Sequence, residues 1–165
     1  MGSNLTLTIW LLVAGTGAVA CRQSSAPLSD DERVIQAWLK CEECSDGELA
    51  AVVKLGTQAI PRFGEALRNG PSQEALEEAR KQAAASHQQM VEYAKTHPNA
   101  PVPMSERDYV NRQEENFIVL YQSRSATALR AIGGPDARKE LTQAASLPLR
   151  PAVLAVVQEA LANMP

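Results

Sequence analysis

The apolar positions of this chain recur every three to four residues along most of its length. The clearest case lies near the C-terminus, where apolar side chains stand at i, i+3, i+4, i+7 and i+8: Val153, Val156, Val157, Ala160 and Leu161. This spacing places them on one face of an α-helix. No stretch alternates convincingly with period two, so the pattern predicts an all-α protein without a sheet.

Caps and breakers divide the pattern into separate helices. Ser29 followed by Glu32 is typical of a capping box at a helix start. Gly56, Gly70 before a proline, and Gly133 before a second glycine are typical stops. We expect helices from residue 29, over 49–55, 57–69, 72–97, 105–132, 136–146 and 149–163. The proline-rich segment 97–103 is predicted to be a stiff, extended loop.

The first twenty residues differ from the rest of the chain. Residues 1–20 carry no charged side chain, and residues 5–20 are almost entirely apolar or small. That run is shorter than the about 20 residues that a membrane-spanning helix needs, and it fits the apolar region of a signal peptide. It ends on small residues followed by a cysteine, Ala18-Val19-Ala20-Cys21.

These residues resemble the lipobox of bacterial lipoproteins. The resemblance implies cleavage before Cys21, a diacylglycerol on its thiol and acylation of the new amine by a fatty acid such as palmitate. We therefore expect a lipoprotein signal peptide over 1–20, lipidation at Cys21 and a flexible tether over 21–28. The sequence after Cys21 lacks the aspartate that marks inner-membrane retention in some lipoproteins, which favours the outer membrane, facing the periplasm. An ordinary cleaved signal and an uncleaved anchor are the alternatives.

An internal similarity links two glycine turns. Leu55-Gly56, Ala59, Phe63 and Ala66 have counterparts in Ile132-Gly133, Ala137, Leu141 and Ala144, at an offset of 77 residues before the turn and 78 after it. These stretches resemble HEAT-like repeats, including those of phycobilin-lyase-type proteins. The resemblance implies an α-α superhelix over 29–165 with a helical insertion at about 72–104. An irregular helical bundle of about six to seven helices is the alternative.

The composition of the chain argues against some classes of function. The chain has 16 basic and 19 acidic residues, a formal charge of −3, and no block of like charge, so no nucleic-acid partner is expected. Aromatic residues make up 4%, which argues against a stacking platform for bases. Four arginines along the 105–132 helix could line a groove for an acidic partner, although a solvated helix face explains them more simply. They are Arg107, Arg112, Arg124 and Arg130.

Cys41 and Cys44 form the pair most suggestive of chemistry. In an oxidising compartment they would form a disulfide, since residues i and i+3 of a helical turn have Cα atoms about 5–5.5 Å apart. The main hypothesis is a local structural clip. The alternative is a redox-active pair, although the acidic residues around the sulfurs disfavour a thiolate. A zinc site needs about four ligands and the chain has only two histidines, so we expect no metal and no cofactor.

No catalytic residue is predicted. His87 and His97 have no recognisable nucleophile partner, and solvent exposure explains both. Glu114 and Glu115 are adjacent and should point to different sides of their helix. We therefore expect a membrane-anchored lipoprotein of the cell envelope, acting as a non-catalytic interaction or structural module for an unknown envelope protein. A thiol–disulfide accessory protein is the second hypothesis, and a bilin-lyase-like role the third.

Overall fold

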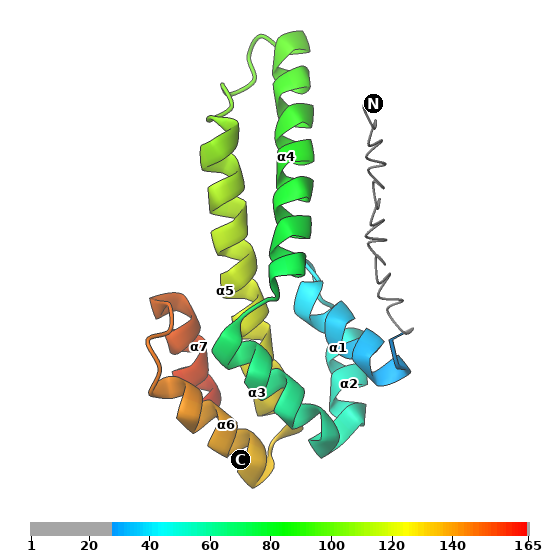
Figure 1. Ribbon diagram of the computed structural model, residues 1–165, viewed down its shortest axis with the longest axis vertical. Helices are drawn as coiled ribbons and strands as arrows, with labels where there is room; N and C mark the ends of the chain where they lie inside the picture. Colours follow the sequence, from blue (N-terminus) through cyan, green and yellow to red (C-terminus); the bar gives the residue numbers. More distant parts are fainter. Residues whose placement is uncertain (1–27, 165) are drawn as a thin grey trace, which may run out of the picture.

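The computed structural model describes residues 28–164, and this part of the chain is all-α (Figure 1). Its elements are α1 (Asp30–Lys40), α2 (Asp46–Leu55), the 3-10 helix η1 (Gly56–Ala59), α3 (Ile60–Asn69), α4 (Gln73–Thr96), α5 (Glu106–Ile132), α6 (Gly134–Ala145) and α7 (Pro151–Ala162). No strand occurs among the described residues. The predicted all-α fold is confirmed.

The predicted signal peptide, the lipidation site Cys21 and almost all of the tether lie outside the described residues. Within the described range, no helix is both long enough and apolar enough to span a membrane.

Serine caps and glycine stops set most helix ends. The hydroxyls of Ser29, Ser72 and Ser105 each accept from the amide three residues on, at 3.2 Å, at the starts of α1, α4 and α5. Gly56, Gly70 and Gly133 end α2, α3 and α5 with φ of 66°, 71° and 73°. A side chain is strained at such a φ, so glycine is the residue that stops these helices cleanly.

The long helix α5 is the common partner of the other helices. One half of it is surrounded by α1, α2, α3, α6 and α7, while its other half pairs with α4 in an antiparallel hairpin that projects beyond the rest of the molecule (Figure 1). The largest fully buried apolar side chains gather around the surrounded half: Phe63, Leu39, Leu67, Leu129, Leu141, Val52, Val153 and Val157. The described helices thus form a bundle with a projecting arm.

A tryptophan fixes the first helix against α5. Trp38 is 5% exposed, and its indole Nε1 donates to the main-chain carbonyl of Arg124 at 3.0 Å. Trp38 is therefore buried on the face of α1 that meets α5. A buried indole needs such an acceptor, so the contact sets both the depth and the orientation of α1.

Helices α3 and α6 approach closely at a glycine. A Cβ added at Gly64 would lie 2.5 Å from Cδ and 3.0 Å from Cγ of Glu140. Glu140 in turn forms an ion pair with Arg68, one turn further along α3. Both helices follow glycine turns that the sequence comparison aligns, and the HEAT-like relationship between them stays a prediction.

Candidate functional site: the groove along the hairpin

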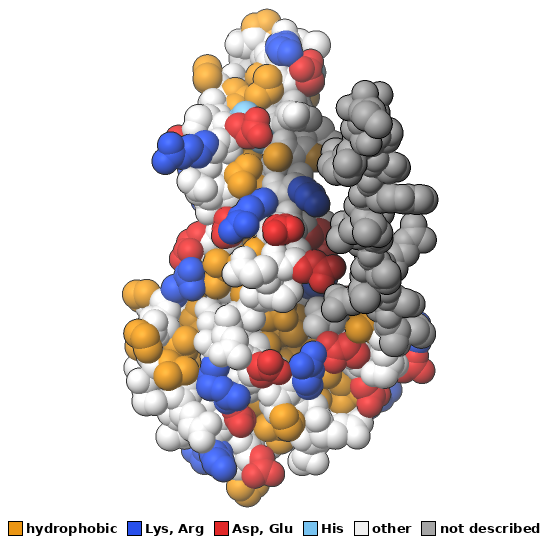
Figure 2. Space-filling view, in the orientation of Figure 1, with side chains coloured by type: hydrophobic (Ala, Val, Ile, Leu, Met, Phe, Trp, Pro, Cys, Tyr) orange, Lys and Arg blue, Asp and Glu red, His pale blue; other side chains and the backbone are white. Residues whose placement is uncertain are grey.

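A cleft of about 730 Å³ runs along the α4–α5 hairpin and ends at the last residues of α1. We call it the hairpin groove. Its lining comes from three parts of the chain: Lys40 and Glu42; Ala75, Glu78, Ala79, Gln82, Ala83 and Ser86; and Tyr109, Gln113, Asn116, Phe117, Val119, Leu120 and Arg124. Figure 2 shows the hairpin surface as apolar side chains interspersed with both charges.

The groove mixes an apolar floor with amide and hydroxyl groups. Helix α4 contributes mainly alanines with Gln82 and Ser86, whereas α5 contributes larger side chains, among them Phe117 and Leu120. Leu120 is 42% exposed and adds apolar surface to the groove. Such a lining can hold a partner that presents both apolar and hydrogen-bonding groups.

Arg124 lies at the α1 end of the groove and is half-buried. Its Nη2 donates to the main-chain carbonyl of Glu42 at 3.1 Å. Burial lowers the pKa of Arg124, and the carboxylates of Glu42 and Glu48 raise it by a smaller amount. No carboxylate of the described residues forms an ion pair with it. Arg124 is therefore a partly desolvated cation that forms no ion pair among the described residues, with the carboxylates of Glu42 and Glu48 acting on it from beyond ion-pair distance.

Other arginines of α5 and its neighbours are compensated or fully exposed. Arg130 of α5 pairs with Glu159 of α7 at 3.8 Å. Arg107 and Arg112 are exposed and do not line the groove. Of the four arginines that the sequence suggested for an acidic partner, the structure places Arg124 alone in a groove.

The adjacent carboxylates of α5 point to different sides, as predicted. Glu114 binds Arg80 of α4, with Nη2 to Oε1 at 2.6 Å, and thus holds the hairpin together. Glu115 pairs with Arg150 at the start of α7, with Nη2 to Oε2 at 2.9 Å. Hydrogen bonds from these arginines lower the pKa of each carboxyl.

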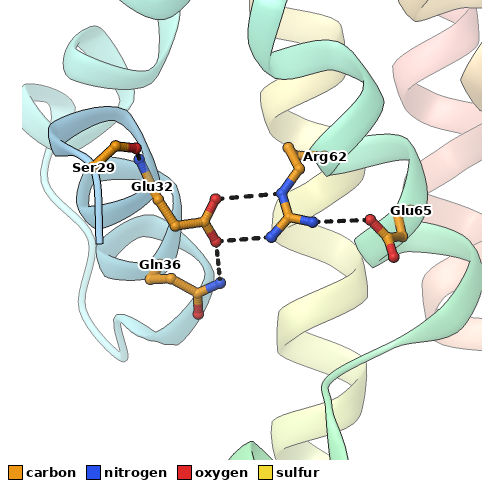
Figure 3. Close-up of polar contacts among 5 residues, drawn as sticks. All are labelled: Ser29, Glu32, Gln36, Arg62 and Glu65. Atoms are coloured by element: carbon orange, nitrogen blue, oxygen red, sulfur yellow. Dashed lines mark hydrogen bonds and ion pairs between the residues drawn. The ribbon is translucent and has the colours of Figure 1, made fainter. Parts of the chain in front are cut away.

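A second ionic cluster joins α1 to α3 (Figure 3). The guanidinium of Arg62 donates from Nη2 to Glu32 Oε1 at 2.9 Å and from Nη1 to Glu65 Oε2 at 3.0 Å. Gln36 donates to the same Oε1 of Glu32 at 3.0 Å. The Arg62 hydrogen bond is the largest cause of the lowered pKa of Glu32. The cluster borders a cleft of about 680 Å³ between α1, α3 and α4, and its groups satisfy one another.

Cys41 and Cys44 lie at disulfide-bonding distance, with Cα atoms 5.7 Å apart, in the short turn between α1 and α2. Both are half-buried. The pair lies beside the groove, because Glu42 between the two cysteines supplies the carbonyl that Arg124 binds. The cysteine turn, residues 41–44, is thus hydrogen-bonded to the α1 end of the groove through Glu42 and Arg124.

One group among the described residues has metal-ligand spacing. The ligand atoms of Cys41, Cys44 and Glu48 all lie within 4.8 Å of one another. Reduced thiols would be needed to bind an ion there, and the Glu48 carboxylate already accepts from the amide of Ser45 at 2.6 Å. Three groups fall short of the about four protein ligands that a structural zinc site uses.

His87 is not a solvated surface residue, so that prediction was wrong. It is 7% exposed, and its Nε2 donates to the carbonyl of Met104 at 2.8 Å. Its ring centroid lies 5.7 Å from that of Tyr109. His87 therefore fastens the loop that closes the hairpin, a contact that no local sequence signal indicates. His97 is exposed as expected, and its ring stacks on Tyr93.

Gln122 is a buried polar residue that the sequence pattern also missed. Its Nε2 donates to the carbonyl of Leu67 at 2.8 Å, and its Oε1 has no partner among the described residues. The residue four positions after Leu67 is Pro71, which has no amide hydrogen to donate. Gln122 thus supplies the donor that the end of α3 lacks.

Comparison of the chain with known protein families, with curated proteins and with solved structures finds no match.

Proposed function

We propose that this protein is a membrane-anchored lipoprotein of the bacterial cell envelope whose helical domain is a non-catalytic protein-interaction module. The observation that carries the binding role is the hairpin groove, with the partly desolvated cation of Arg124 at one end. A projecting hairpin with an open groove is suited to holding a partner protein rather than to enclosing a substrate.

The anchor rests on the resemblance of Ala18-Val19-Ala20-Cys21 to a lipobox. Each buried methylene of an acyl chain contributes about 0.8 kcal/mol, so one chain binds only marginally and two or three hold a protein durably. Residues 21–28 then serve as the tether between the outer membrane and the helical domain.

Both described histidines are engaged in structural contacts. The Nε2 of His87 is used by the Met104 carbonyl, and the Nδ1 of His97 lies 3.0 Å from the Tyr93 carbonyl. Each contact uses one nitrogen of its ring, and neither histidine lines the hairpin groove. The binding role proposed for the groove therefore involves no histidine.

Site-specific photo-crosslinking in intact cells tests the binding role. A photoreactive side chain is placed at Leu120 in the groove or at Val53 on α2, which is also 42% exposed and lies outside the groove. We expect a discrete crosslinked species from position 120 and none from position 53. Equal crosslinking from both positions, or none from position 120, would contradict the proposal.

Intact mass of the protein from its native membrane tests the anchor separately. The expected species begins at Cys21 and carries acyl chains. A chain that keeps residues 1–20, or that begins after them without acyl groups, would contradict the lipoprotein assignment and leave the groove experiment unaffected.

A second candidate function, that of a thiol–disulfide accessory protein, is favoured by the place of Cys41 and Cys44 beside the groove. A partner held in the groove would lie next to the two sulfurs. Replacing both cysteines by serine distinguishes the two roles. Loss of partner oxidation with unchanged crosslinking at position 120 would indicate redox activity, and no change in partner oxidation would indicate a structural clip.

A further inference from the structure

We propose that the occupant of the hairpin groove is an amphipathic α-helix of another protein that places a carboxylate against Arg124. This inference rests on the proposed function and specifies the chemistry of the partner. Three features of the groove support it: its length, its mixture of apolar and polar side chains, and the arginine at its α1 end.

The shape of the groove fits a helix. Its lining comes from the antiparallel helices α4 and α5 and, at one end, from Lys40 and Glu42 at the close of α1. From Ala75 to Ser86 its α4 wall spans twelve residues, and the eleven rises between them amount to roughly 17 Å at 1.5 Å per residue. A partner helix of three turns fills that length, and helices commonly bind in such grooves through residues at i, i+3, i+4 and i+7.

The lining favours a polypeptide over an acyl chain. Gln82, Ser86, Gln113 and Asn116 stand among the apolar groups along the walls. An acyl chain would desolvate these amides and the hydroxyl without offering any hydrogen bond, at a cost of about 1–3 kcal/mol for each buried group. An amphipathic helix can meet them with polar side chains at the edges of its apolar face.

The charges at the α1 end select a carboxylate. Lys40 and Glu78, both in the lining, already pair at 3.5 Å. Arg124 is half-buried and uses one donor on the Glu42 carbonyl, and the carboxylates of Glu42 and Glu48 act on it without forming an ion pair. The Arg124 guanidinium has further N–H groups that a carboxylate can meet bidentately, and desolvation strengthens such a pair.

The chain's own N-terminal segment does not supply the carboxylate. Residues 1–29 contain no aspartate or glutamate. A tether folding back over the domain would therefore offer Arg124 no side-chain ion pair, and we assign the groove to a separate protein.

The test uses full-length protein purified from the cell fraction that holds it, and a phage-displayed library of helical peptides with one face randomised. We expect enriched peptides to carry Asp or Glu near one end of an apolar stripe. For a synthesised winner, Arg124→Gln should weaken the dissociation constant by roughly ten- to a hundredfold, the loss of one charge-assisted pair. Arg107→Gln, which changes an exposed arginine of the same helix that does not line the groove, should leave it unchanged.

Two further variants keep the test interpretable. Arg124→Lys preserves the charge without the bidentate geometry and should give an intermediate affinity. Ala79→Arg obstructs the groove wall without touching Arg124 and should abolish binding. Far-UV circular dichroism of each variant confirms that the helices persist, so a misfolded protein is not counted as a loss of binding.

Several results would overturn the inference. These are the absence of enriched peptides, enrichment of peptides without a carboxylate, equal binding by Arg124→Gln, or displacement of the peptide by vesicles of anionic phospholipid. Self-association that Ala79→Arg removes would assign the groove to a second copy instead. Crosslinking at position 120 in cells together with failure of the peptide test would leave the proposed function standing and remove only the acidic helix.

Discussion

The contact between Gly64 and Glu140 predicts a change of sign in a double-mutant cycle. Gly64 lies inside α3, where alanine would favour the helix by about 1 kcal/mol over glycine. In this position, however, the new Cβ would lie 2.5 Å from Cδ of Glu140. Glu140 can clear it only by turning away from Arg68 or by moving α6 away from α3.

The magnitudes decide which effect is larger. Overpacking between helices costs about 1–3 kcal/mol. The ion pair of Arg68 with Glu140, partly exposed at both side chains, contributes up to about 1 kcal/mol after solvent screening. Turning Glu140 away forfeits the ion pair and offsets the gain in helix propensity, whereas moving α6 costs more than that gain. Gly64→Ala should therefore lower the free energy of unfolding by up to about 2 kcal/mol.

The sign should reverse when the obstacle is removed. In a Glu140→Ala background no carboxylate remains to collide, and Gly64→Ala should then raise the free energy of unfolding by up to about 1 kcal/mol. Urea denaturation of the four proteins, followed by far-UV circular dichroism, measures both steps. Additive effects, within the roughly 0.5 kcal/mol expected for independent sites, would refute the close approach of α3 and α6.

Further predictions concern three other contacts. Gln122→Leu should lower the free energy of unfolding by about 1–3 kcal/mol, because the Leu67 carbonyl loses its donor and Pro71 has no amide hydrogen to replace it. Urea denaturation measures this free energy, and an unchanged value would contradict the prediction. Arg62 lowers the pKa of Glu32 in the folded state, so the pair contributes to the free energy of unfolding above the ordinary pKa of 4.5. That contribution is lost as the pH falls through the lower pKa of the folded state. Acid unfolding of Glu32→Gln should therefore be less steep than that of the unchanged protein, and superimposable curves would count against the pair. Reduction of the Cys41–Cys44 pair should cost at most about 2 kcal/mol because the loop is so short, and a larger loss in thermal melts with reductant would indicate a wider structural role.

Local signals in the sequence were sufficient for most of the secondary structure. Ser29, Ser72 and Ser105 accept amide hydrogens at the predicted helix starts, and Gly56, Gly70 and Gly133 stop helices where expected. Caps and stops involve atoms only a few residues apart, so their chemistry is visible in a short stretch of sequence. The 3-10 turn Gly56–Ala59, predicted as the start of an α-helix, shows the limit of this reasoning.

The groove depends on packing between distant segments, and of its lining residues the sequence singled out only Arg124, as one of four candidates. Arg124 resembles the other arginines of α5 in sequence, and its setting is created by α1 and the cysteine turn, 82 residues away along the chain. His87 and Gln122 were missed for the same reason. Each buried side chain donates to a main-chain carbonyl, His87 to that of Met104 and Gln122 to that of Leu67. Every residue has a carbonyl, so such an acceptor gives no pattern in the sequence.

The position of α5 as common partner also has a consequence for the order in which the chain can fold. Helices α1, α2 and α3 all pack on a helix that ends at residue 132, and the contact of Trp38 with Arg124 spans 86 residues. During synthesis the N-terminal helices therefore emerge without the surface that buries their apolar faces, and most of the chain must be complete before a stable core can form. If the protein is exported as proposed, this delay keeps the chain free of compact structure that would resist translocation.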